Sequence, residues 1–181
     1  MKKIALAGAG GTGKSTLAAE VNKRYGTPVI PEYAREVAVE MKVENIRKME
    51  PDVAYEFQCR ILDKKIAEEN SHETFIADRS MADVMAYYLR WCSREIDDDR
   101  NKKYIDRCAE QLKHYDQVVV LPPVIPLEND GFRSAKVYYQ YEIHCLVVGI
   151  LVDKEIPWST LSETAMDKRV DYIQALYEDQ A

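Results

Sequence analysis

Near its start the chain carries a stretch, GAGGTGKST (residues 8–16), whose residue types suit the binding of a nucleotide phosphate. The stretch matches GxxxxGK[ST] at every fixed position. Glycines let successive backbone N–H groups face one anion, while Lys14 reaches the β- and γ-phosphates and Ser15 ligates Mg²⁺. We therefore predict a P-loop that binds ATP, although the pattern leaves ATP and GTP as alternatives. The residues predicted to contact the nucleotide are Gly8, Gly10, Gly11, Thr12, Gly13, Lys14, Ser15 and Thr16.

The same glycines also match GxGxxG, the dinucleotide-binding fingerprint, between Gly8 and Gly13. A lone GxGxxG is weak evidence. Lys14 and Ser15 follow it directly, and this pair favours the P-loop interpretation.

A P-loop nucleotide usually needs an acidic group on its magnesium side, at the end of a nearby strand. Asp78 ends the apolar run TFIA, so Asp78 is our candidate for the metal shell, together with Ser15. Arg79 follows at once and suits the clamping of an acceptor or of the transferring phosphoryl group. The structural alternatives are that Asp78 caps the helix starting near Met81 and that Arg79 forms a salt bridge.

The segment PEYAR (residues 31–35) follows a second predicted strand and indicates the acceptor side. Glu32 is the candidate general base for a substrate hydroxyl, and Arg35 is expected on the same face. A purely electrostatic role for Glu32, at a helix N-terminus, is the alternative. The polar loop at residues 126–136 carries Arg133 and is the candidate lid over the triphosphate, with a solvated connection as its alternative.

Apolar runs alternate with helical patterns along the whole chain, which indicates an α/β fold with a parallel sheet. We expect about five strands flanked by helices in a single P-loop NTPase domain over residues 1–181. The strands are expected at residues 3–7, 27–30, 74–77, 117–121 and 157–161. The helices are expected at residues 15–25, 52–69, 82–92, 103–113, 136–152 and 165–178. The Tyr-rich segment at 137–142 is interpreted as core plus amphipathic surface.

Composition places the chain among globular proteins. Hydrophobic residues make up 46% and charged residues 31%, and the formal net charge is −6. An acidic balance argues against a long nucleic-acid surface. The apolar run at the start is short and no long apolar stretch follows, so we expect a cytoplasmic protein without a membrane partner.

The quoted segments together resemble the P-loop nucleoside and nucleotide kinase group, most closely the ribosylnicotinamide kinase domain of an AAA-like ATPase/kinase family. GAGGTGKST, PEYAR, FIADRS and YDQVVVLPPVIPLENDGFRS occur in the order of that family. The resemblance implies a three-layer α/β fold, ATP as donor and Mg²⁺. It further implies that Glu32 lies near the acceptor, Asp78 near metal or acceptor hydroxyl, and Arg133 in the lid. DRS at 78–80 instead resembles thymidylate and deoxynucleoside kinases.

The sequence thus predicts an ATP-dependent kinase whose acceptor is a small nucleoside or nucleotide, of nicotinamide riboside or deoxynucleoside type. The residues predicted to act in transfer are Lys14, Glu32, Asp78, Arg79 and Arg133, and those predicted to bind the acceptor are Glu32, Arg35 and Arg79. One alternative is a kinase of a hydroxymethylated base in DNA, to which a basic band at residues 94–107 would contribute. Another is a regulatory NTPase. The oligomeric state, including a homodimer, stays open.

Overall fold

The computed structural model describes residues 2–46, 48–125 and 137–178. Its strands are β1 (Lys3–Ala7), β2 (Val29–Ile30), β3 (Phe75–Asp78), β4 (Gln117–Val120) and β5 (Trp158–Thr160). Its α-helices are α1 (Lys14–Tyr25), α2 (Ala34–Glu40), α3 (Pro51–Ser71), α4 (Met81–Trp91), α5 (Asp98–Leu112), α6 (Val137–Asp153) and α7 (Met166–Glu178). A 3₁₀ turn, η1 (Ser93–Glu95), joins α4 to α5.

The five strands form one parallel sheet in the order β2-β3-β1-β4-β5. Its register brings three strand ends to one edge, because Leu6 pairs with Asp78 and Ala7 pairs with Val120. Ligands of open parallel sheets bind beyond the carboxyl ends of the strands. This edge is therefore where the chain can assemble a site.

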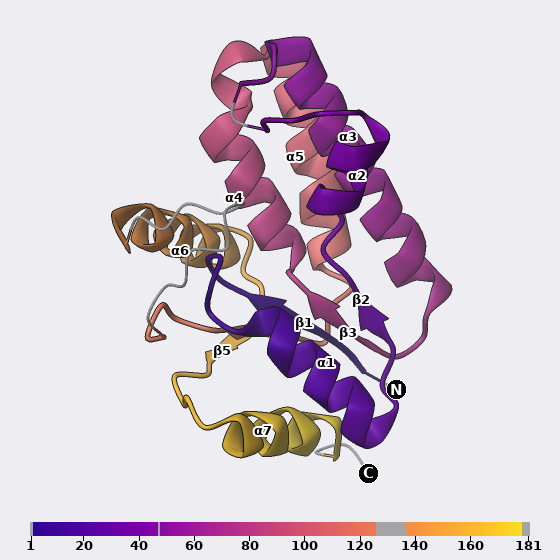
Figure 1. Cartoon of the computed structure of the whole chain (residues 1–181), viewed down its shortest axis with the longest axis vertical. Helices are drawn as coiled ribbons and strands as arrows, with labels where there is room; N and C mark the ends of the chain where they lie inside the picture. Colours follow the sequence, from indigo (N-terminus) through magenta and orange to yellow (C-terminus); the bar gives the residue numbers. More distant parts are fainter. Residues whose placement is uncertain (1, 47, 126–136, 179–181) are drawn as a thin grey trace.

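Helices cover both faces of the sheet, which gives three layers (Figure 1). The pleat of β1 shows the division: Ile4 and Leu6 pack in the cluster with α1 and α7, whereas Ala5 and Ala7 pack in the larger cluster with α2 to α6. The fold class expected from the sequence is confirmed.

The predicted elements correspond to the observed ones with small shifts at their ends. Two differences stand out, and the first has a clear cause. α5 begins at Asp98 rather than at residue 103, since Asp97 caps it and its acidic first turn complements the helix dipole. The short helix α2, which contains Arg35, adds a helix that we expected only as a first turn. The candidate lid at 126–136, with Arg133, lies outside the described residues.

Among the described residues, no helix is both long and apolar enough to cross a membrane.

Candidate functional site

The P-loop lies between β1 and α1 and depends on glycine at two points. Gly8 has φ 126°, and a Cβ there would lie 2.5 Å from the Leu121 carbonyl oxygen. Gly13 is the N-cap of α1 with φ 86°, a conformation that other residues resist. The loop can therefore keep this shape only with glycine at both positions.

Lys14 is buried and its ammonium lies against the loop itself. Nζ donates to the carbonyl oxygens of Gly8 (2.7 Å) and Ala9 (2.6 Å) and to Thr12 Oγ1 (3.2 Å). Burial, reinforced by the nearby Arg79 charge, lowers the pKa of Lys14 to about 8. A negatively charged phosphate would relieve this cost, so the loop is electrostatically suited to bind an anion.

Three side chains from distant helices hold the P-loop backbone from outside. Asp83 Oδ1 accepts a hydrogen bond from the Gly8 N–H (2.9 Å). Gln140 Nε2 donates to the Gly10 carbonyl (2.9 Å), and Arg169 Nη1 donates to the Thr12 carbonyl (3.0 Å). None of the three is among the site residues predicted from the sequence.

The turn from β3 into α4 presents Asp78 and Arg79 at the same edge. Asp78 is the last residue of β3, and its buried Oδ1 has no hydrogen-bond partner among the described residues. Ser80, not Asp78, caps α4. Its side chain accepts hydrogen bonds from the backbone N–H groups of Ala82 and Asp83, and the Asp83 carboxylate accepts one from the Ser80 N–H. The capping alternative for Asp78 is therefore wrong, because the helix starts too late for it.

Arg79 has φ 89°, which is costly for a residue with a side chain and is typically kept where geometry serves function. The turn directs its guanidinium toward Glu32, with 3.0 Å between Nε and Oε2, and over the Tyr87 ring at 4.6 Å. Neither the buried Nε nor Nη1 has a well-aligned hydrogen-bond partner among the described residues. The contact with Glu32 is thus an ion pair that leaves donors available.

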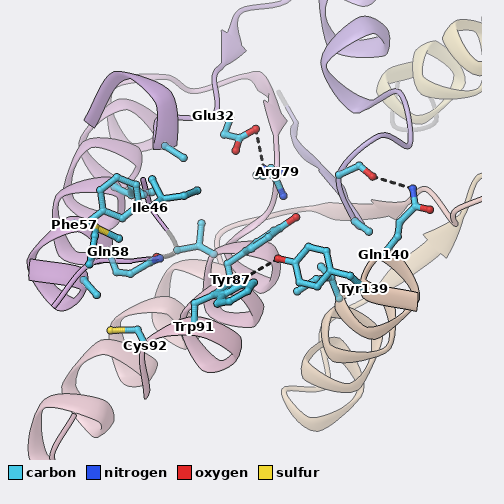
Figure 2. A pocket seen from close by; sticks show the side chains of 18 residues that line it. Glu32, Ile46, Phe57, Gln58, Arg79, Tyr87, Trp91, Cys92, Tyr139 and Gln140 are labelled. Atoms are coloured by element: carbon cyan, nitrogen blue, oxygen red, sulfur yellow. Dashed lines mark hydrogen bonds and ion pairs between the residues drawn. The ribbon is translucent and has the colours of Figure 1, made fainter. Parts of the chain in front are cut away.

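A cavity of about 160 Å³ opens beside this ion pair (Figure 2). Its walls are mostly apolar and aromatic, and Trp91 Nε1 donates to the Tyr139 hydroxyl at 2.7 Å across one side. Its polar groups are few and come from separate elements. They include Glu32, Gln58, Arg79 and Gln140, beside Tyr87 and Tyr139, and Ala9 and Gly10 of the P-loop also line the cavity. The cavity therefore joins the acceptor-side residues to the P-loop in one space.

The predicted site residues are only partly brought together. Glu32 and Arg79 line the cavity, and Lys14 interacts electrostatically with both of them and with Asp78. Arg35 is exposed on the first turn of α2 and does not line this cavity. No cluster of three or more metal-ligating side chains occurs within the residues that the structure describes.

The cavity's other polar and aromatic groups are not recognisable as functional from the sequence. Gln58 is a nearly buried amide between apolar neighbours on α3, and this break in an apolar stripe was its only signal. The tyrosines of residues 137–142 fall into two environments. Tyr138 is 89% exposed at the surface, whereas Tyr139 lines the cavity. Helical spacing indicates a buried face but not which neighbour that face meets.

Solved structures with a similar fold match the chain at low sequence identity. A deoxyadenosine kinase from M. mycoides with dCMP and dCDP bound has a TM-score of 0.67 at 18% identity, covering 98% of this chain and 99% of the other. The NadR protein in complex with NR has a TM-score of 0.73 at 18% identity, and the match covers 98% of this chain but 51% of NadR. YorR from Bacillus subtilis, in complex with phosphorylated GDP, has a TM-score of 0.57 at 19% identity, covering 97% and 95%.

No curated protein matches the chain. The family comparison is more decisive, because residues 3–169, almost the entire described fold, match the AAA domain. This chain therefore belongs to the AAA domain family.

Proposed function

We propose that the chain is an ATP-dependent kinase that phosphorylates a hydroxyl group of a nucleoside. One observation carries the proposal: a single cavity has the P-loop backbone of Ala9 and Gly10 at one end and the Glu32–Arg79 ion pair in its wall. A donor phosphate on the loop and an acceptor in the cavity would meet beside a carboxylate and a guanidinium. These are the groups that phosphoryl transfer requires.

In this proposal Glu32 takes the proton of the acceptor hydroxyl as the hydroxyl oxygen bonds to the γ-phosphorus. The bond from that phosphorus to the β-bridging oxygen breaks, and ADP leaves. Lys14 and the unused donors of Arg79 stabilise negative charge on the transferring group. Glu32 is suited to the first role because its side chain is only 17% exposed and faces the cavity.

Mg²⁺ would be held by the Ser15 hydroxyl and Asp78, where it would neutralise charge on the phosphates. The orphaned, buried Oδ1 of Asp78 fits this assignment, since an unpartnered carboxylate oxygen is costly unless a cation or water meets it. Ser15 is exposed on the first turn of α1 and is open to such a ligand.

The cavity favours a neutral nucleoside over a charged acceptor. Its volume of about 160 Å³ is close to that of cavities that bind one benzene-sized ring, so it suits a base between aromatic walls. Gln58 offers both a donor and an acceptor to the edge of that base. Among the described lining residues, Arg79 is the only cation, and Glu32 already balances its charge.

A base within DNA is a weaker candidate acceptor. In the basic band that supported this alternative, Arg100 pairs with Asp52 and Asp97, Lys102 pairs with Asp106, and Arg107 pairs with Asp63. Cations neutralised in this way release few counterions from a phosphate backbone. No specific observation favours the regulatory NTPase.

The test is an ATP-consumption screen against ribo- and deoxynucleosides, their monophosphates, nicotinamide riboside and hydroxymethylated DNA. Turnover with a nucleoside is expected. Turnover only with monophosphates or DNA would overturn the proposed acceptor class. ATP hydrolysis without any acceptor would instead support a regulatory NTPase.

A further inference from the structure

Arg169, the fourth residue of α7, lies fully buried against the P-loop although it is 153 residues or more from it in sequence. Nη1 donates to the Thr12 carbonyl at 3.0 Å, and Nε donates to the Glu163 carbonyl. A Cβ at Gly13 would lie 2.9 Å from Nη1, so a larger residue there would push the guanidinium away from the loop. The backbone of the P-loop and the Arg169 side chain are therefore in close contact.

Among the described residues, the charge of Arg169 is met only by longer-range attraction to the Glu163 carboxylate. Within the described ranges no carboxylate forms an ion pair with it, and its buried Nη2 has no hydrogen-bond partner there. Burial lowers the pKa of Arg169, but a guanidinium in a protein still keeps its proton. The residue also lies in the first turn of α7, where the helix dipole disfavours a cation. A buried charge without an ion pair at contact distance costs folding stability, and a bound anion would offset that cost.

The hydrogen bond to Thr12 has a geometric consequence for the loop. In a trans peptide the C=O and the following N–H point in opposite directions, and the described residues contain no cis peptide bond. By holding the Thr12 carbonyl, Arg169 turns the Gly13 N–H away from itself. That N–H belongs to the part of the motif whose backbone cradles phosphate.

We propose that Arg169 is a positioning residue for the donor phosphates, which aims the Gly13 N–H and supplies a buried positive charge that a bound polyphosphate would compensate. The inference rests on the proposed function, since it requires a nucleotide on the P-loop. It adds a residue from the far end of the chain to the donor site.

The experiment compares Arg169→Gln, which removes the charge but keeps an N–H donor, with Arg169→Lys, which keeps the charge. Lys168→Gln is the matched control, because Lys168 is the exposed neighbouring cation. Calorimetry measures the affinity for ADP, without acceptor, at low and high salt. Competition with ADP gives the affinity for inorganic triphosphate. The melting temperature of each chain is recorded without ligand. Arg169→Gln is expected to weaken both ADP and triphosphate about tenfold without lowering the ligand-free melting temperature. Arg169→Lys and Lys168→Gln should stay within about threefold of wild type.

Unchanged ADP affinity in Arg169→Gln would overturn this inference alone. So would a lower ligand-free melting temperature or failure to fold, because the arginine would then be supporting the empty structure. A loss seen with ADP but not with triphosphate would assign Arg169 to the base instead. A wild-type chain that binds no ADP would overturn the proposed function itself, and this inference with it.

Discussion

Glu32 and Arg79 follow two adjacent strands, β2 and β3, and their side chains meet with 3.0 Å between Oε2 and Nε at the wall of the cavity. The pairing needs the positive φ of Arg79, which turns its guanidinium back across the strand end. Burial alone would lower the pKa of Arg79. The charge of Glu32, together with other groups around the guanidinium, holds that pKa well above its usual value. Arg79 therefore stays charged, and it keeps Glu32 oriented beside the acceptor space.

Replacing Glu32 by Gln tests the general base. The amide keeps the shape of the side chain but cannot accept the hydroxyl proton, so kcat is expected to fall about a hundredfold or more. ADP affinity should change little, because Glu32 lies on the acceptor side. Steady-state kinetics and calorimetry measure the two quantities. Glu36→Gln, an exposed carboxylate on α2, is the control and should keep full activity; full activity in Glu32→Gln would remove Glu32 from the mechanism.

Replacing Gln58 tests how the cavity recognises its acceptor. Leucine fills similar space without hydrogen-bonding groups, so KM for the acceptor should rise at least about tenfold while KM for ATP is unchanged. A nucleoside panel run on both chains measures the change and its dependence on the base. Gln174→Leu on the exposed face of α7 is the matched control. An equal rise for every base would mean that Gln58 shapes the cavity rather than reading the base edge.

The sequence predicts the donor half of this site well, because a P-loop is local. Its chemistry depends on nine adjacent residues between one strand and one helix, and the strand-end rule then selects Glu32, Asp78 and Arg79. The groups that complete the site are not local. Gln58, Gln140 and Arg169 reach it from three different helices, through packing of side chains that periodicity alone cannot pair.

Asp83 illustrates the same limit within one short motif. Ser80 and Asp83 have capping-box spacing, which predicts a helix start. The spacing does not predict the role of the second carboxylate oxygen, which accepts a hydrogen bond from the N–H of Gly8, 75 residues earlier in the chain. Only the parallel register of β1 and β3 brings these two together.

Lys14→Met tests the electrostatic cost of the empty P-loop. The folded-state pKa of Lys14, about 8, lies below its ordinary value of 10.5. Between these values the unfolded chain binds more protons than the folded chain, so wild-type stability gains up to about 3 kcal/mol as pH rises through this window. Below pH 8 the cost of the buried charge is present in full.

The methionine variant lacks this titration, so its stability relative to wild type should decline as pH rises from 8 to 10. Urea unfolding at pH 7, 8, 9 and 10 gives the two profiles, and tyrosine ionisation cancels in their difference. Lys23→Met, an exposed lysine on the same helix, should run parallel to wild type. Parallel profiles for Lys14→Met would show that the Lys14 ammonium is solvated in the empty loop.

Tyr115→Phe tests a buried polar network behind the site. The Tyr115 hydroxyl donates to Glu69 Oε1 (2.7 Å) and accepts from the Met81 N–H (3.2 Å), the first residue of α4. Gln111 Nε2 donates to Glu69 Oε2 at 2.9 Å, and Lys65 Nζ lies 3.0 Å from Oε1. The network thus anchors the end of the turn that carries Asp78 and Arg79.

Removing the hydroxyl leaves a buried N–H and a carboxylate oxygen without this partner, which is expected to cost about 1–3 kcal/mol of unfolding free energy. A turn held less firmly should also lower kcat severalfold at a temperature where the variant is fully folded, since transfer depends on the position of Arg79. Chemical unfolding and steady-state kinetics measure the two effects. Tyr25→Phe, at an exposed position on α1, should change neither. If stability fell and kcat did not, the network would support the fold without positioning the turn.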